Sequence, residues 1–173
     1  MVKAVFLDRD GVLNDLVDGH APWCFEDFHL KPGVTEQIHR LREAGYFLVV
    51  VSNQPDILDG NLHPHHAAYM RSVLQMIGID AVHFSLNRTA PDYKPGNAAL
   101  EYYIDKFKID RSKSWMVGDR WKDIEAGIKS GLTTMLVYDK HNLYPPPSQK
   151  LQPHSRVGSL KSAVDYILEL ENL

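Results

Sequence analysis

Two aspartates one residue apart, Asp8 and Asp10, are the strongest chemical signal near the start of the chain. They follow an apolar run at residues 2–7 that contains valine and phenylalanine and predicts a buried β-strand. Carboxylates at the end of a strand can bind a hard cation such as Mg²⁺, and one of them can attack a phosphorus atom. The other lies close enough to protonate a leaving alcohol and later to deprotonate water. The spacing therefore predicts phosphoryl transfer, with a plain polar turn, which also favours Asp and Gly, as the alternative.

Three further polar side chains, Ser52, Lys94 and Asp119, each come after a different predicted strand. Parallel strands end at the same edge of a sheet, so we expect these side chains to meet Asp8 there. Ser52 and the backbone amides after it can hydrogen-bond phosphoryl oxygens, and Lys94 can offset the charge of the transition state. The expected protein ligands of Mg²⁺ are Asp8, Asp119 and the backbone carbonyl of Asp10.

Apolar periodicity predicts that strands and helices alternate along the chain. The predicted strands cover residues 2–7, 46–51, 81–86, 114–117 and 133–138. The predicted helices run from Pro32-Gly33 to Gly45, over 64–77 and 97–107, up to Gly131, and from residue 160 onward. Such alternation implies β-α-β crossovers, a parallel sheet and helices on both of its faces. We therefore expect an α/β fold with a doubly wound parallel sheet, in a single domain over residues 1–173.

Three stretches lack periodicity and are predicted to be irregular, namely residues 15–31, 55–63 and 139–155. The first is long for a loop in a compact domain, and such loops are usually functional or disordered. Neither this loop nor residues 55–80, which hold one predicted helix, can form a large cap domain. We therefore expect an open site, and we place the more polar strand at 81–86 near an edge of the sheet.

Composition limits the class of partner. The chain has 173 residues, a net charge of −3 and no basic footprint for nucleic acid or polybasic patch for a membrane surface. Its single cysteine, Cys24, excludes an intrachain disulfide and fits a reducing compartment. The sequence has no signal-peptide pattern and no apolar run of membrane-spanning length. We expect a cytoplasmic protein, monomeric rather than oligomeric, whose partner is a small phosphorylated metabolite and not nucleic acid or membrane.

Four motifs occur in order, and together they resemble the haloacid-dehalogenase-like (HAD) phosphatase superfamily. They are Asp8-Arg9-Asp10-Gly11-Val12-Leu13-Asn14, Ser52-Asn53-Gln54, Lys94-Pro95-Gly96 and Gly118-Asp119-Arg120-Trp121-Lys122-Asp123. Within the superfamily, the first, second and fourth motifs look like the histidinol-phosphate and D,D-heptose bisphosphate phosphatase branch. The resemblance implies a HAD-like Rossmannoid hydrolase that depends on Mg²⁺ and forms an aspartyl-phosphate.

The same resemblance implies a role for each matching residue. Asp8 would be the nucleophile, Asp10 the acid and base, Asp119 a metal ligand, and Asp123 a support that orients the catalytic Lys94. The positions implied in substrate or phosphate binding are Arg9, Asn14, Ser52, Asn53, Gln54 and Arg120. The expected substrate is a phosphosugar such as D-glycero-D-manno-heptose 1,7-bisphosphate, with histidinol phosphate or a nucleic-acid 3′ end as alternatives.

One departure from this branch concerns zinc. The branch usually carries a zinc-binding loop, with three Cys and a His, before the catalytic lysine. Residues 87–93 contain neither residue type, and His63, His65 and His66 lack further ligands at zinc-site spacing. We therefore expect no structural zinc, and we interpret the three histidines as the solvated start of a helix.

A receiver-like signalling module is the alternative from another functional class. Receivers also place acidic residues, a hydroxyl residue and a lysine at one edge of a parallel sheet. Their phosphorylated aspartate follows the third strand, where this chain has Asn87. The spacing of Asp8 and Asp10 favours turnover instead, because a second carboxylate beside the nucleophile can activate water. A stable phosphoprotein would indicate a receiver, and repeated phosphate release would indicate an enzyme.

Overall fold

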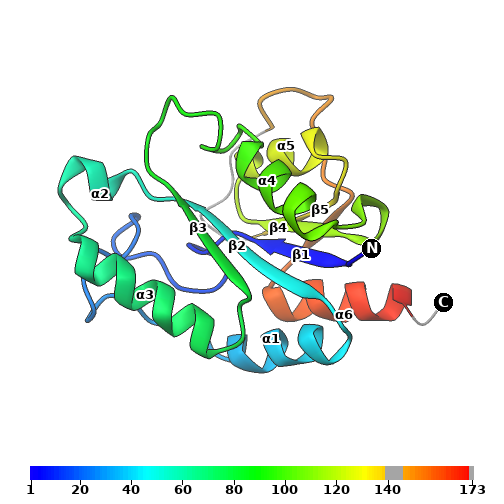
Figure 1. Ribbon diagram of the computed structural model, residues 1–173, viewed down its shortest axis with the longest axis horizontal. Helices are drawn as coiled ribbons and strands as arrows, with labels where there is room; N and C mark the ends of the chain where they lie inside the picture. The colour runs from blue at the N-terminus through cyan, green and yellow to red at the C-terminus, as the bar shows by residue number, and fades with distance from the viewer. Residues whose placement is uncertain (139–145, 172–173) are drawn as a thin grey trace.

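A single six-stranded parallel sheet organises the computed structural model, which describes residues 1–138 and 146–171 (Figure 1). The strands lie in the order β3-β2-β1-β4-β5-β6. Their bounds are β1 Ala4–Leu7, β2 Phe47–Asn53, β3 Ala81–Ser85, β4 Trp115–Gly118, β5 Thr133–Val137 and β6 Ser155–Val157. All five neighbouring pairs are parallel. The predicted doubly wound α/β fold is confirmed, and β3 lies at a sheet edge as expected.

The middle strand, β1, is the point from which the sheet grows in both directions. Phe6 pairs with Val49 of β2 on one side and with Met116 of β4 on the other. All four residues of β1 are buried, because helices cover both faces and leave no solvent side for polar residues. In a doubly wound sheet, ligands bind beyond the carboxyl ends of the strands where the order reverses. Here that point is the carboxyl end of β1, between β2 and β4.

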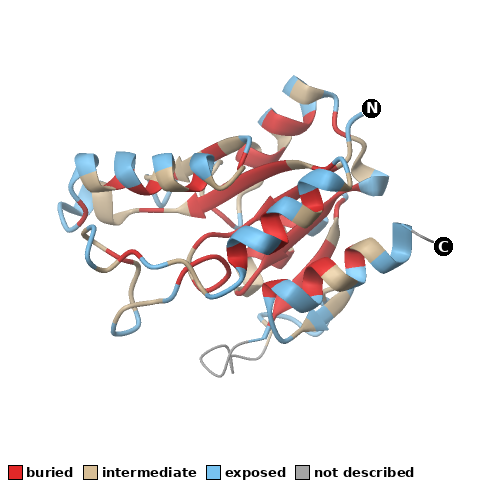
Figure 2. Ribbon diagram, turned by 90° about the horizontal axis from the view of Figure 1, so that it is seen from below, coloured by how far each residue is buried: buried red, intermediate tan, exposed pale blue. Residues whose placement is uncertain are grey.

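Helices cover both faces of the sheet, and Figure 2 shows their buried residues turned toward it. Their bounds are α1 Val34–Glu43, α2 Asp56–Asp59, α3 Pro64–Met76, α4 Ala98–Phe107, α5 Trp121–Lys129 and α6 Leu160–Glu171, with a 3₁₀ turn at Arg111–Lys113. Helices α1, α3 and α6 contribute to one hydrophobic cluster, whereas α4 and α5 contribute to a second cluster on the opposite face (Figure 1). None of the helices in the described part of the chain is long and apolar enough to cross a membrane.

The predicted polar loop at 55–63 contains one helical turn, α2, that the sequence pattern did not indicate. None of its residues is buried, so there was no apolar periodicity to indicate it. Gly60 ends the turn with a φ of 82°, a left-handed conformation that glycine adopts without a Cβ clash. The turn places the Asp59 carboxylate beside the Arg88 guanidinium, with N–O distances of 2.9 and 2.5 Å.

A second difference lies at the end of the stretch predicted to be irregular, residues 139–155. Residues 139–145 lie outside the described part of the chain, but Ser155 starts β6 at the edge of the sheet. This strand has three residues and none is buried, so neither length nor apolar alternation could indicate it. It is held by main-chain pairing with β5 and by the adjoining His154, whose Nδ1 accepts from the N–H of Thr134 at 3.0 Å.

The three neighbouring histidines lie at the start of α3, as predicted. His63 is the N-cap residue, and its Nδ1 accepts a hydrogen bond from the N–H of His65 at 3.2 Å. The Nδ1 of His66 lies 3.0 Å from the carbonyl oxygen of Trp23 in the loop that follows β1. These contacts give the rings a local structural role, tying the long loop to the helix.

Candidate active site

The carboxyl ends of β1, β2 and β4 meet around a hollow of about 460 Å³. Asp8 follows β1, Ser52 and Asn53 end β2, and Asp119 follows β4; all four line the hollow together with Asp10. The residues are distant in the sequence and are brought together because parallel strands end at one edge. The hollow lies at the reversal point of the strand order.

A buried acidic cluster is formed by Asp8, Asp119 and Asp123; Asp8 and Asp119 line this hollow, and Asp123 lies behind them. One oxygen of each residue lies within 4.8 Å of the others, and the three residues are 5, 3 and 0% exposed. Gly11 allows the Asp119 carboxylate to lie against the backbone after β1, because a Cβ at Gly11, whose φ is +83°, would lie 2.2 Å from Oδ2 of Asp119. Buried carboxylates at this separation need cations to offset their charge.

Lys94 supplies one of these cations from the loop after β3. Its Nζ lies 2.8 Å from Oδ1 of Asp8 and 2.7 Å from Oδ1 of Asp123, and it donates to the carbonyl of Val51 at 2.6 Å. Burial alone would lower the pKa of Lys94, but the charges of Asp123 and Asp8 outweigh it and raise the pKa above its ordinary value. The ammonium therefore stays charged at neutral pH.

The backbone of Lys94 is held by Asn53 at the end of β2. The side-chain amide of Asn53 accepts from the N–H of Lys94 and donates to its carbonyl, both at 2.9 Å. The resemblance implied a substrate contact for Asn53. Asn53 does line the hollow, but both polar ends of its amide are engaged by Lys94.

Asp123 is fixed by the start of α5. Its Oδ2 accepts the N–H of Arg120 at 2.9 Å, which leaves Oδ1 toward Lys94. The side chain of Asp123 packs directly against the end of β4, where a Cβ at Gly118 would lie 2.2 Å from the Cβ of Asp123. This geometry accords with the supporting position implied for Asp123, between a helix start and the lysine.

Asp10 is surrounded by three side-chain donors. Arg9 donates from Nη2 at 2.8 and 3.0 Å and from Nε at 3.0 Å, Asn14 donates at 2.9 Å and Gln54 at 2.6 Å. The resemblance implied substrate or phosphate binding for these three donors. Instead all three are fully buried, and their polar groups are directed at the Asp10 carboxylate. Their burial leaves no surface for a ligand.

Two basic residues and part of the long loop complete the rim. Arg120, predicted to bind phosphate, lines the hollow, and its Nε lies 3.5 Å from Oδ2 of Asp119. Lys122 also lines it, and its place in the fourth motif was the available signal for that position. Leu16, Gly19 and Ala21 form the wall from the loop at 15–31. Their side chains carry no reactive group, so the sequence could not single them out.

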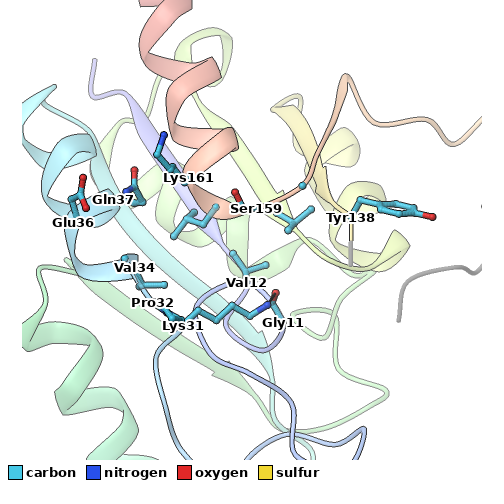
Figure 3. Close-up of a pocket in the computed structure, with 14 residues that line it drawn as sticks. Gly11, Val12, Lys31, Pro32, Val34, Glu36, Gln37, Tyr138, Ser159 and Lys161 are labelled. Atoms are coloured by element: carbon cyan, nitrogen blue, oxygen red, sulfur yellow. Dashed lines mark hydrogen bonds between the residues drawn. The ribbon is translucent and has the colours of Figure 1, made fainter. Parts of the chain in front are cut away.

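A second hollow of about 530 Å³ lies between the starts of α1 and α6, beyond the end of β5 (Figure 3). Among the described residues that line it, Glu36 is the one acidic residue, and no residue of the buried acidic cluster reaches it. Lys31 extends from this hollow to the loop after β1, where its Nζ donates to the carbonyl of Gly11 at 2.8 Å. The described residues of this hollow therefore lack the groups for phosphoryl transfer, and the first hollow is the candidate active site.

Comparisons with known proteins identify the family of the chain. Residues 93–150 match a family model described as HAD-hydrolase-like. The D-glycero-D-manno-heptose-1,7-bisphosphate 7-phosphatase of Chlorobaculum tepidum is 32% identical over 161 residues, covering 81% of this chain and 80% of that protein. The enzyme of the same name from Thermosynechococcus vestitus is 32% identical over 188 residues, covering 95% of this chain and 94% of that protein.

Among solved structures, a D,D-heptose 1,7-bisphosphate phosphatase from B. bronchiseptica, crystallised with magnesium and phosphate, superposes with a TM-score of 0.84. The match covers 98% of this chain and 99% of that one at 22% identity, so it shows the fold. The fold and the carboxylate–lysine set define a HAD-like hydrolase. The chain belongs to the HAD phosphatase family of these bacterial relatives, and it is a phosphatase.

Proposed function

We propose that this phosphatase hydrolyses a phosphosugar, D-glycero-D-manno-heptose 1,7-bisphosphate, through a phosphorylated Asp8. The observation that carries the proposal is the buried acidic cluster with Lys94 bound between Asp8 and Asp123 at 2.8 and 2.7 Å. The names of the relatives support the choice of substrate. The hollow of about 460 Å³ is within the usual range for a site that binds a small metabolite.

The charge of the buried cluster fits a divalent cation. Lys94 pairs with Asp8 and Asp123, and the Arg120 guanidinium lies 3.5 Å from Asp119, so the three carboxylates exceed these two cations by one negative charge when all groups are ionised. Asp8, Asp119 and the backbone carbonyl of Asp10 would hold Mg²⁺, while Asp123 is already engaged by Lys94. When bound, Mg²⁺ supplies charge that lets an anionic phosphate approach the Asp8 carboxylate.

The residues of the chain account for both halves of the reaction. A carboxylate oxygen of Asp8 forms a bond to phosphorus as the bond from phosphorus to the leaving oxygen breaks, and Asp10 gives that oxygen a proton. Asp10 then takes a proton from water, whose oxygen attacks phosphorus and releases the Asp8 carboxylate. Lys94 and the Ser52 hydroxyl stabilise the charge on the phosphoryl oxygens in both halves.

The rim supports a substrate with a second anionic group. Arg120 and Lys122 line the same hollow as Asp8 and provide two positive charges at its edge. Two cations suit one further phosphate, whereas a polynucleotide draws affinity from many contacts along a basic groove. This arrangement favours a compact bisphosphate over a nucleic-acid 3′ end.

Competition kinetics test the substrate class. Phosphate release is measured with Mg²⁺, and again with EDTA, for heptose 1,7-bisphosphate, histidinol phosphate and a 3′-phosphorylated oligonucleotide. We expect the highest kcat/KM for the bisphosphate and loss of turnover with EDTA. A higher kcat/KM for the oligonucleotide, with a steep salt dependence, would refute the metabolite assignment. A stable phosphoprotein without repeated release would indicate a receiver-like module.

A further inference from the structure

The carboxylate of Asp10 lies at the edge of an open hollow, but hydrogen bonds hold it in one orientation. Both of its oxygens accept hydrogen bonds: Oδ1 from Arg9 and Asn14, and Oδ2 from Arg9 and Gln54. Its side chain keeps 13% of its surface exposed, toward the hollow that it lines. Rotation of the carboxylate would therefore break several hydrogen bonds at once.

The guanidinium of Arg9 is itself immobilised on the side away from the hollow. The side chain has no exposed surface, and its Cζ lies 5.7 and 5.3 Å from the ring centroids of Phe28 and Phe84. Its Nη1 lies 3.3 Å from the sulfur of Met70. A buried, aromatic-flanked guanidinium paired with a carboxylate is a rigid partner, because the planar fork fixes the direction of both hydrogen bonds.

Gln54 links Asp10 to the phosphate-binding side of the site. Its Nε2 donates to Oδ2 of Asp10 at 2.6 Å and to the hydroxyl oxygen of Ser52 at 2.9 Å. The side chain is fully buried, and its own backbone N–H donates to the carbonyl of Ser85 in β3. One amide thus sets the distance between the carboxylate that moves protons and the hydroxyl expected to bind phosphate.

We propose that Arg9 and Gln54 are positioning residues that hold the Asp10 carboxylate at the leaving-group oxygen, and that neither contacts substrate. The inference rests on the proposed aspartyl-phosphate chemistry but not on the identity of the sugar. It predicts a defect that falls chiefly on proton transfer, with a smaller loss from the contact between Gln54 and Ser52. A leaving group that departs without a proton should be nearly insensitive to either residue, whereas an alcohol should be strongly sensitive.

Two simple phosphate esters distinguish a leaving group that needs a proton from one that does not. Benzyl phosphate releases an alcohol that needs protonation, and p-nitrophenyl phosphate releases a stable phenolate. Rapid-quench measurement of the first turnover isolates the attack by Asp8 from the later hydrolysis, in which Asp10 also takes part. In Gln54→Leu we expect the first-turnover rate to fall by about 100-fold with benzyl phosphate and by less than about 5-fold with p-nitrophenyl phosphate.

Arg9→Met, which keeps an unbranched apolar chain in place of the guanidinium, should show the same selective loss. Gln54→Asn replaces Gln54→Leu if the latter is not folded by circular dichroism, and it should lose the alcohol reaction because its shorter amide retracts from Asp10. The matched control is Gln37→Leu, which removes a buried amide on α1 that does not line this hollow. It should leave both first-turnover rates unchanged.

Equal losses with both phosphates in the folded variants would show that Arg9 and Gln54 shape the site generally, and would overturn the proposal. Unchanged rates with benzyl phosphate would overturn it as well. Failure of the proposed substrate is distinguishable, since it would leave the wild-type enzyme active on both simple phosphates and inactive on the heptose bisphosphate.

Discussion

At the residue scale, the charges of buried side chains must balance one another, because little solvent reaches the site. Lys94 has its ammonium between two buried carboxylates, and the lysine and both aspartates are almost fully buried. Removing one partner of such a set leaves uncompensated buried charge, which costs far more than the net value of the pair. The lysine is therefore expected to matter to the stability of the fold as well as to catalysis.

Replacement of Lys94 by methionine tests this expectation. We expect Lys94→Met to lower the free energy of unfolding by about 3–5 kcal/mol, because Asp8 and Asp123 lose their shared cation. The folded-state pKa of Lys94 is raised, so its stabilisation is fully present below the ordinary value of 10.5 and is lost only as the pH rises through the folded-state pKa. Urea unfolding should therefore give the same loss at pH 6 and pH 9. A loss that disappears at pH 9 would show that the lysine is not held in its charged form.

Gly11 offers a second test at this scale. Gly11→Ala adds a Cβ 2.2 Å from Oδ2 of Asp119, at a φ of +83° that already disfavours alanine. We expect the Mg²⁺ concentration for half-maximal activity to rise, because Asp119 must move. Gly60→Ala is the matched control, since its φ is +82° and nothing lies within 4 Å of the added Cβ. An equal rise in both variants would assign the effect to backbone strain and not to Asp119.

At the element scale, the sequence predicted the helices and strands that bury apolar residues and missed α2 and β6, which bury none. Strands buried on both faces give continuous apolar runs, so β1 and β2 were evident. The turn α2 and the strand β6 bury no residue, so they left no hydrophobic pattern. Motif spacing likewise placed Arg9 and Gln54 near the reaction but could not give the direction of their side chains. That direction depends on the rings and strands packed around them.

The loop before Lys94 is tied to neighbouring elements by two side-chain contacts. Its Arg88 pairs with Asp59 of α2, and its Asp92 lies 2.8 Å from Nε2 of His83 in β3. We predict that protein purified without a histidine tag contains less than stoichiometric zinc by elemental analysis after dialysis. One zinc per chain that survives dialysis would show that the histidines or other residues form a site that these contacts do not indicate.

At the scale of the whole molecule, the reversal of strand order explains why one sheet edge carries the chemistry. Strands β2 and β3 extend to one side of β1 and β4 to β6 to the other, so the loops after β1 and β4 diverge around a hollow. Nearly all of the candidate site follows from this topology and from residue types at strand ends. The apolar wall of the long loop does not, because its residues have no chemical signature.

We expect metal binding to stabilise the whole fold, because this edge of the sheet carries excess negative charge. A ligand that binds only the folded state stabilises it by about 2.7 kcal/mol at 100 times its Kd. We predict that Mg²⁺ raises the Tm of the wild-type protein and leaves that of Asp119→Asn nearly unchanged, as measured by calorimetry. An equal rise in both proteins would place the responsible ion elsewhere.

We propose that Asp8 becomes covalently phosphorylated during turnover. Asp8→Asn keeps the shape of the side chain but removes the nucleophile, and Lys94 still has Asp123 as a partner. Steady-state phosphate release by Asp8→Asn and wild type, on the same phosphosugar with saturating Mg²⁺, is the most direct test. We predict a fall in kcat of at least about 1,000-fold in a variant that remains folded by circular dichroism. A folded Asp8→Asn protein with a near-wild-type rate would show that Asp8 is not the nucleophile.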